Sequence, residues 1–513
     1  MSFILALFPI ALILVLMVGF RWGAARAGSA GYLVALPIAV GYFGAGVDLL
    51  AYAHAKALLL SLDVLLIIWA AFLLYRVADE AGAIRTIGQA LPHLTNDLGM
   101  QALIIGWIFA SFLQGVGGFG VPVAVIAPLL IGLGFTPLAA VVIPSIGHGW
   151  AVTFGSLGSS FQALQAATGQ PAAMLGPPTA IFLGIAGVVT GWMVAHAAQS
   201  WPAVRRLFFS VMAIGLVMGI ILYLMVAAGL WNIASFVASI GGLLVCYPLA
   251  KRFRGGEKDN GKFDLPGLLV ALSGYAILVA LILAVQLIPD VNSFLNQVAL
   301  QMSFPQVSTR LGFITPAGMG RKISVFGHSG MVLFYACILA YLVYRWAGLY
   351  QPGAVQRIVS GTLRGVLTSS VSIVAMLTMA VVMEHAGMTD ALARGLADSV
   401  GSAFPLVSPW IGALGAFMTG STTNSNVVFG ALQMHTAELL GFSLAFILAA
   451  QTSGASVASV MAPAKVVVGA STAGMAGREG DVMRKLLPYA IILVLLICAL
   501  AIVGVWWKSG ISI

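Results

Sequence analysis

Residues Ser111 to Pro122 read SFLQGVGGFGVP, so that four glycines within six residues, and then a proline, stand inside a long apolar stretch. Glycine and proline both weaken or break a helix. Backbone that leaves helical geometry at membrane depth frees amides and carbonyls, which is tolerated only where protein or a water-filled cavity satisfies them. The stretch predicts a broken or re-entrant element over about residues 98–134, with free amides facing an anion. Close packing of helices through small residues is the alternative.

A second interruption, Phe417 to Gly430, reads FMTGSTTNSNVVFG and contains six consecutive hydroxyl or amide side chains. Burying each of these polar groups costs about 1 kcal/mol or more unless it is paired. An extramembrane loop between two short helices is one interpretation. We instead expect a second re-entrant element over about residues 404–441, where a ligand or ion pairs with Ser421, Thr422, Thr423, Asn424, Ser425 and Asn426.

Outside these two elements the chain is apolar almost throughout. Of its 513 residues 61% are hydrophobic and 8% are charged, whereas soluble domains have about a quarter of charged residues. A spanning helix needs about 20 mainly apolar residues, and the sequence supplies such runs repeatedly. We predict an all-α polytopic membrane protein with about 12 transmembrane helices besides the two hairpins, at 3–20, 29–47, 57–77, 137–155, 176–199, 203–228, 230–250, 265–288, 323–345, 365–386, 443–472 and 487–507.

Basic residues indicate the orientation of these spans. If the N-terminus lies outside, Arg76, Arg205, Arg357 and the segment Lys251 to Lys262 all fall on one side, which the positive-inside rule assigns to the cytoplasm. Basic residues follow the first apolar run, whereas a secretory signal has them in front. We therefore expect a retained first helix.

The chain also repeats itself. Ala81-Gly82 recurs as Ala386-Gly387, and Gly115 recurs as Gly420, each 305 positions later. With the spans above, the two copies run in opposite directions, an arrangement that secondary transporters use to build a midplane site from discontinuous helices. We divide the chain into a first half (1–250), a cytoplasmic linker (251–264) and a second half (265–513).

Other functions are disfavoured by patterns that the sequence lacks. The three cysteines lie in apolar runs without metal-like spacing, and the basic residues form no stripe suited to nucleic acid. Neither a Walker motif nor an HExxH motif occurs. We expect no enzyme activity, no cofactor, no metal and no nucleic-acid partner, with a lipid bilayer as the surroundings.

Ionisable residues at membrane depth are functional candidates by default. His148 and Lys465 lie in segments broken by glycine and proline, and Asp63 lies in the middle of a span. We expect His328 and Glu384, by contrast, to lie near span ends that water reaches.

At the two interrupted elements the sequence resembles the lactate permease family of bacterial secondary transporters. The resemblance covers most of the chain and is densest from Ser111 to Leu138, in TGSTTNSN (Thr419 to Asn426), and in AAQTSG followed by Pro463. It implies import of a small 2-hydroxymonocarboxylate, such as lactate or glycolate, with a proton. It also implies a fold of inverted repeats whose hairpin tips hold the substrate, and a homodimer.

The chain departs from the pattern of this family at polar positions, and two carboxylates that would carry a proton are absent. The hypothesis that follows is that His148, because histidine titrates in the physiological range, or Asp63 couples the proton. The departures are Gln114 (usually Glu), Thr422 (usually Asp), His148 and Gln451 (each usually Asn), and Lys465, which stands six residues after the place near Ser459 where the family tends to have a lysine.

We therefore expect a proton-coupled symporter of a small hydroxy acid in a bacterial-type inner membrane. A sodium-coupled or exchange carrier of another organic anion, such as a dicarboxylate or a sulfonate, is one alternative, since the oxygens of Ser421 to Asn426 would also suit Na⁺. A passive anion channel is another. The expected substrate-binding residues are Gln114, Gly115, Gly117, Gly118, Phe119, Gly120, Ser421, Thr422, Thr423, Asn424, Ser425, Asn426 and Lys465.

Overall fold

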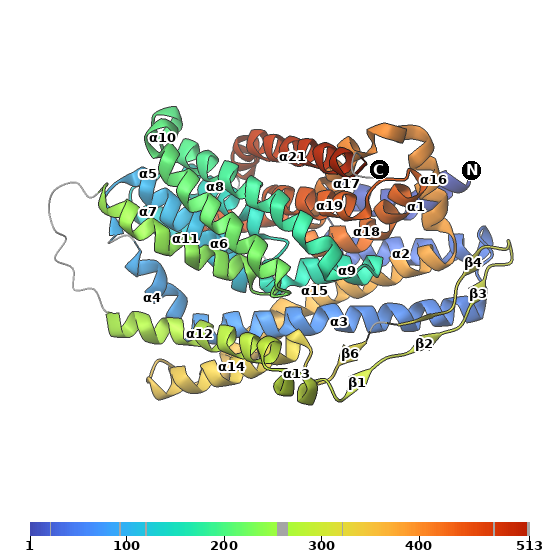
Figure 1. Cartoon of the computed structure of the whole chain (residues 1–513), viewed down its shortest axis with the longest axis horizontal. Helices are drawn as coiled ribbons and strands as arrows, with labels where there is room; N and C mark the ends of the chain where they lie inside the picture. Colours follow the sequence, from blue (N-terminus) through green and yellow to red (C-terminus); the bar gives the residue numbers. More distant parts are fainter. Residues whose placement is uncertain are drawn as a thin grey trace.

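The structure, a computed structural model, is an elongated bundle of helices that lie side by side along its long axis (Figure 1). Within the described residues, twelve helices are long and apolar enough to cross a membrane. The predicted fold class, an all-α polytopic membrane protein, is confirmed. The described residues are 1–20, 22–91, 94–117, 121–253, 265–320, 322–475 and 478–509.

The first half begins with three helices, and a long helix near its end turns back on itself. Helix α10 leaves helical geometry at Gln199 and Ser200, and Gly184 before this turn touches Gly219 after it, so α10 forms the two spans that the sequence predicts there. The elements are α1 (Ser2–Val18), α2 (Ala24–Gly41), α3 (Val47–Glu80), α4 (Ala83–Ala90), α5 (Leu98–Gln101), η2 (Ala102–Phe109), α6 (Ala110–Val116), α7 (Val121–Gly132), α8 (Pro137–His148), η3 (Gly149–Ala151), η4 (Ser156–Gly158), α9 (Ser159–Thr168), α10 (Ala172–Ala227) and α11 (Ala234–Lys251).

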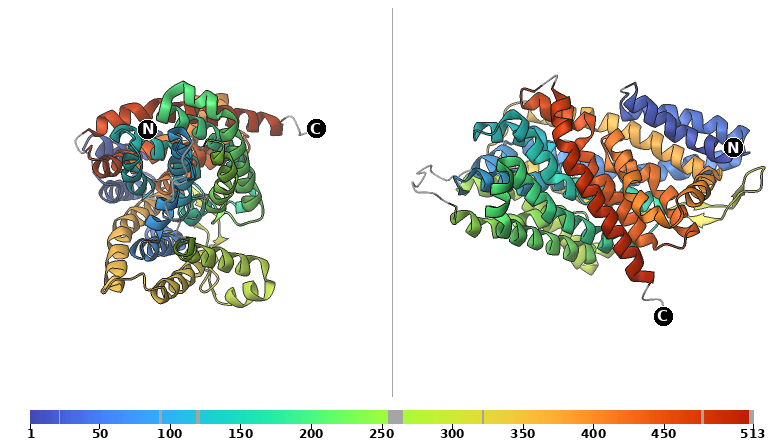
Figure 2. Two further views of the ribbon diagram at one scale, coloured as in Figure 1. Left: turned by 90° about the vertical axis from the view of Figure 1, so that its left-hand side faces the viewer. Right: turned by 90° about the horizontal axis from the view of Figure 1, so that it is seen from above.

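The second half contains a second hairpin and a second broken helix, and its last helix crosses the outside of the bundle obliquely (Figure 2). The elements are α12 (Leu265–Leu287), α13 (Pro289–Leu295), α14 (Ser329–Trp346), α15 (Ala354–His385), α16 (Met388–Val400), η5 (Gly401–Ala403), α17 (Phe404–Thr419), α18 (Thr422–Leu439), α19 (Leu444–Ala458), η6 (Ser459–Met461), α20 (Pro463–Thr472) and α21 (Glu479–Ser509).

A β-hairpin extension between α13 and α14 was not expected from the sequence. It lies at the same end of the molecule as the N-terminus (Figure 1). Residues 323–324, which we placed in a span, belong to this extension instead, and α14 begins only at Ser329. Three antiparallel pairs form it: β1 (Ala299–Leu300) with β6 (Ile323–Ser324), β2 (Ser303–Phe304) with β5 (Gly318–Met319), and β3 (Val307–Ser308) with β4 (Ile314–Thr315).

Helices α3 and α15 lie antiparallel against each other at the centre of the inverted arrangement. Lys56 near the start of α3 pairs with Glu384 near the end of α15 (3.7 Å), and Glu80 at the end of α3 pairs with Arg357 near the start of α15 (2.6 Å). Each helix is followed by a glycine in the left-handed backbone conformation, and then by a short helix, a helical hairpin and a broken helix. The two repeats therefore run in opposite directions, as the sequence predicts.

Paired glycines fix the first arm of each hairpin to the broken helix of the same half. A methyl group on Gly147 would lie 1.8 Å from the carbonyl oxygen of Gly106, and one on Gly454 would lie 2.3 Å from that of Pro409. Gly412 and Gly454 follow Gly106 and Gly147 by 306 and 307 positions. Such direct backbone contact is typical of membrane helices, and here it recurs in both repeats.

Cationic residues gather at the end of the bundle away from the N-terminus. Arg357 contacts the end of α3 there, and Arg206, beside the turn in α10, pairs with Asp97 at 2.9 Å. The division into two halves and a linker stays a prediction. From residue 254 to residue 264 the linker lies outside the described residues.

Candidate functional site

A small cavity lies where the second hairpin tip meets the two broken helices. Its volume is about 20 Å³, which is room for about one water molecule. Most of its lining is polar, in contrast with the apolar chain around it. The lining residues are Gln114, Val152, Ser156, Ser159, Ser160, Gly420, Ser421, Thr422, Thr423 and Lys465.

The two broken helices are joined by hydrogen bonds across their breaks. The Thr153 amide donates to Ser456 Oγ (3.2 Å), and Ser456 Oγ donates to the Gly149 carbonyl (2.8 Å). Thr153 Oγ1 also lies 3.1 Å from Thr452 Oγ1. Side chains of one repeat thus satisfy backbone groups that the break exposes in the other.

Three helices begin at this cavity. Ser159 and Ser160 form the first turn of α9, Thr422 and Thr423 form the first turn of α18, and Lys465 lies in the first turn of α20. The N-terminal end of a helix has a partial positive charge and unpaired amides. Three such ends around one cavity favour an anionic group there.

The turn that leads into α9 is strained. Ser156 and Leu157 have φ angles of 46° and 56°, and Gly158 follows with 79°. Residues other than glycine rarely adopt this left-handed geometry, which costs about 1–3 kcal/mol and concentrates at binding sites. Ser156 itself lines the cavity.

Lys465 supplies a full positive charge at the same place. Its side chain is 8% exposed, and its ammonium group donates to Ser459 Oγ at 3.1 Å. Among the described residues no carboxylate forms an ion pair with it. The lysine that the resemblance places near Ser459 therefore has a counterpart here, since the longer reach of Lys465 brings its ammonium group back to Ser459.

The polar run after Gly420 divides into two sets. Ser421 caps α18 by accepting from the Asn424 amide (3.2 Å), and together with Thr422 and Thr423 it lines the cavity. The other three side chains bind neighbouring helices: Asn424 donates to Ser372, Ser425 to the Gly412 carbonyl, and Asn426 to the Ser160 carbonyl and Thr452.

The first hairpin contributes Gln114, whose buried Oε1 has no hydrogen-bond partner among the described residues. The expectation of a free amide at Gly117 is wrong, because this amide donates to the Leu113 carbonyl (2.8 Å). Gly115 lies inside α6, and a methyl group on it would lie 2.9 Å from the backbone of Phe236 on α11. Gly118, Phe119 and Gly120 lie outside the described residues.

His148 ends α8 and is completely buried. Its Nδ1 lies 2.6 Å from the Pro144 carbonyl, which can only accept, so Nδ1 bears the proton of the neutral ring. Nε2 is left as an acceptor with no partner among the described residues. His148 does not line the cavity.

Asp63 forms a buried cluster with His328 and Gln162. His328 Nε2 lies 3.0 Å from Asp63 Oδ1, and Gln162 Nε2 donates to Asp63 Oδ2 at 2.6 Å. His328 Nδ1 accepts from the Gly330 amide, so Nε2 is the nitrogen that donates to Asp63.

The expectation that water reaches His328 is wrong. His328 caps the start of α14 and is only 8% exposed. Gly330 explains the burial: a methyl group there would lie 2.6 Å from the backbone of Leu66, so this end of α14 packs directly on α3. Glu384 does lie at a helix end, with its side chain 28% exposed.

Sequence reasoning missed Ser159 and Ser160 as site residues. Both lie beside the cavity, in the segment GSLGSS, Gly155 to Ser160. Two glycines that bracket a helix break, followed by two serines at the start of the next helix, are the signal that could have identified them.

Two helical hairpins, two broken helices, and a buried lysine at a polar central cavity define a multi-pass membrane transport protein. Residues 2–506 match the L-lactate permease family. The chain belongs to this family, which confirms the resemblance found in its sequence.

Relatives of known name cover most of the chain. The L-lactate permease of Bacillus subtilis (strain 168) is 27% identical over 83% of this chain and 82% of its own. The glycolate permease GlcA of Escherichia coli (strain K12) is 27% identical over 96% of this chain and 93% of its own. Among solved structures, the YdaH transporter of Alcanivorax borkumensis aligns with a TM-score of 0.49 and 17% identity over 91% of this chain and 88% of its own.

Proposed function

We propose that this protein imports a small 2-hydroxymonocarboxylate, of the lactate or glycolate kind, together with a proton across a bacterial-type inner membrane. The observation that carries the proposal is Lys465, a buried ammonium group that borders a hydroxyl-lined cavity and pairs with no carboxylate of the described residues. An unpaired buried charge is costly, and a substrate carboxylate would offset that cost. The names of the relatives supply the substrate class.

The lining around Lys465 suits a carboxylate with a neighbouring hydroxyl group. The ammonium group and the three helix ends favour the negative charge. Ser159, Ser160 and Thr422 offer hydroxyl groups that both donate and accept, as the 2-hydroxyl of the substrate requires. A dicarboxylate would need a second cation, and Lys465 is the only Lys or Arg that lines the cavity as described.

Asp63 and His328 form the proton-binding site in this proposal. Both oxygens of Asp63 accept hydrogen bonds, one from His328 and one from Gln162. A proton on either oxygen would compete with one of these donors. Gln162 lies on α9 one turn after Ser159, so protonation of Asp63 would loosen the helix whose first turn borders the cavity.

The helices around this pair carry few charged residues at its depth. Helix α9 has no charged residue, α14 has none before Arg345, and α15 has none between Arg364 and Glu384. Lys56 lies about 10 Å away, two turns earlier on α3. Because ionisable groups inside a membrane are rare and mark proton pathways, the buried pair of Asp63 and His328 is favoured over sodium coupling. Two residues of the sodium alternative, Asn424 and Asn426, are bound to neighbouring helices.

Transport also requires the cavity to open. About 20 Å³ does not admit a molecule of six heavy atoms, so the structure corresponds to a closed state. In the proposal, movement of the hairpins and broken helices against the surrounding helices opens the cavity to each side in turn.

Uptake of labelled L-lactate into proteoliposomes tests the proposal, with an imposed pH gradient in one sample and a sodium gradient in another. We expect the wild type to accumulate L-lactate with the pH gradient, a protonophore to abolish this accumulation, and Lys465→Gln to accumulate far less at the same L-lactate concentration. Accumulation with the sodium gradient alone would overturn proton coupling, and equilibration without accumulation would indicate a channel. If no uptake occurs in either gradient, the substrate assignment is wrong.

A further inference from the structure

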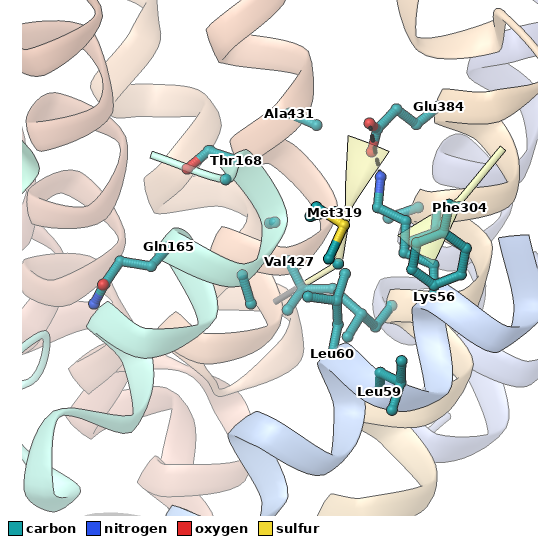
Figure 3. Close-up of a pocket in the computed structure, with 17 residues that line it drawn as sticks. Lys56, Leu59, Leu60, Gln165, Thr168, Phe304, Met319, Glu384, Val427 and Ala431 are labelled. Atoms are coloured by element: carbon teal, nitrogen blue, oxygen red, sulfur yellow. Dashed lines mark ion pairs between the residues drawn. The ribbon is translucent and has the colours of Figure 1, made fainter. Parts of the chain in front are cut away.

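A second and larger cavity lies between α3, α9, α15 and α18. Its volume is about 290 Å³, and Phe304 and Met319 of the β-hairpin extension cover one side of it (Figure 3). Its walls are mainly apolar, with one pair of opposite charges, Lys56 and Glu384. Figure 3 shows the Lys56 amine directed toward the Glu384 carboxylate.

This cavity lies toward the side of the membrane opposite to the cation-rich end. Lys56 and Glu80 are 24 residues apart on α3, which corresponds to about 36 Å at 1.5 Å per residue. The hydrocarbon core of a bilayer is about 30 Å thick. Because the cation-rich end faces the cytoplasm by the positive-inside rule, the cavity faces the outside.

The two cavities share two walls. On α9, Ser160 borders the small cavity and Gln165 borders the large one; on α18, Thr423 borders the small cavity and Val427 the large one. The two cavities are separated by five residues on α9 and four on α18, which correspond to about 6–8 Å of helix. The helices pack together between the cavities, and the Ser160 and Thr423 hydroxyl groups are hydrogen-bonded at 3.0 Å. The seam between α9 and α18 is therefore a direct route that is closed in this structure.

The ion pair inside the large cavity is suited to exchange partners. Lys56 Nζ and Glu384 Oε1 are 3.7 Å apart, beyond the usual 2.7–3.2 Å of a hydrogen bond. Both side chains are about 30% exposed (30% and 28%), so water can take the place of either partner. An exposed pair of this kind is worth about 0–1 kcal/mol, which an incoming carboxylate can replace.

We propose that this cavity is an outer binding site for the carboxylate substrate, where the Lys56 ammonium group exchanges the Glu384 carboxylate for that of the substrate. The proposal rests on the proposed function, because it takes the substrate to be a small monocarboxylate. From this site the substrate reaches Lys465 when α9 and α18 separate. Apolar walls strengthen the attraction between Lys56 and an anion by lowering the local dielectric.

A cysteine at Ala431 tests the site directly, because Ala431 lines the large cavity. The three native cysteines are buried. A membrane-impermeant thiol reagent added outside right-side-out vesicles should label Ala431→Cys, and L-lactate should slow this labelling about tenfold. Adding Lys56→Gln to the variant should remove the protection, whereas Lys56→Arg should keep most of it. Ala437→Cys, on the same helix but in a separate buried cluster, is the control that should stay unlabelled.

Transport kinetics give a second measurement. Glu384→Gln removes the competing carboxylate, so we expect the KM for uptake from outside to fall several-fold, and Lys56→Gln should raise it about tenfold. The outer site is overturned if Ala431→Cys is labelled only from the inside, or if protection by L-lactate survives in Lys56→Gln. If the wild-type protein takes up no L-lactate, the proposed function has failed first. If Ala431→Cys takes up L-lactate but L-lactate does not slow its labelling, the outer site alone is refuted.

Discussion

The Asp63 carboxylate on α3 and the His328 imidazole at the start of α14 lie 3.0 Å apart, although 265 positions separate them in the chain. Asp63 is 1% exposed and His328 8%. A carboxylate and a ring that can each bind a proton thus meet inside a membrane-spanning bundle, one helix away from the polar cavity.

Replacing Asp63 separates proton coupling from substrate binding. Asp63→Asn keeps the shape of the side chain but cannot ionise, so we expect accumulation driven by a pH gradient to fall to the background level. Exchange of labelled for unlabelled L-lactate across the membrane needs no net proton movement and should persist. Glu438→Gln, which alters an exposed carboxylate, is the control and should behave as the wild type. If Asp63→Asn lost both exchange and accumulation, Asp63 would be needed for folding or for substrate binding instead.

We expect substitutions of His148 and His328 to have different effects on the pH dependence of uptake. His148 donates a hydrogen bond from Nδ1 to the Pro144 carbonyl of its own helix and does not line the cavity. His148→Gln should therefore leave the pH profile of uptake unchanged. His328→Gln should change that profile, since it removes the titratable partner of Asp63. An altered profile in His148→Gln alone would transfer the coupling role to His148.

Lys465 should matter for affinity more than for folding. Removing one partner of a buried charged contact costs about 2–5 kcal/mol, so Lys465→Gln should raise the KM for L-lactate by at least about thirtyfold. Lys465→Arg preserves the charge and should retain part of the activity. Thermal unfolding measured in detergent is the control. If Lys465→Gln and Lys465→Arg lose affinity equally and both have a much lower Tm, Lys465 has a structural role instead.

The glycine contact between α17 and α19 makes a prediction about stability. A methyl group at position 454 would lie 2.3 Å from the Pro409 carbonyl oxygen, and overpacking of this kind costs about 1–3 kcal/mol. Gly454→Ala should therefore lower the Tm by several degrees. Gly132→Ala is the matched control, because a methyl group there meets no atom within 4 Å, and its Tm should not fall.

The sequence predicted both hairpins and the inverted order of the repeats, because these features depend on local composition and on spacing along one chain. Apolar runs of membrane length and glycine-rich interruptions are local signals. The β-hairpin extension gave no such signal. Its three pairs have two residues per strand, which is too short for an alternating pattern to emerge.

The sequence pointed to cavity-lining residues where the signal was local, and it missed contacts that depend on packing between distant segments. Lys465 and Thr422 border the cavity, and both stand out in the sequence as polar residues within apolar runs. The partner of Asp63 could not be predicted, since His328 is near a helix end where water is the usual neighbour. Its burial depends on Gly330, which allows α14 to pack against α3. The local sequence of neither segment indicates this contact.

The glycine pairs of the two repeats limit which parts of the molecule can slide. Gly147 lies against the Gly106 backbone in the first repeat, and Gly454 lies against the Pro409 backbone in the second, so neither pair of helices can shift along its contact without collision. The first arm of each hairpin and the broken helix of the same half therefore form one rigid unit. In the proposed transport cycle each hairpin arm therefore moves together with its broken helix, and the sliding surfaces are the opposite faces of these helices.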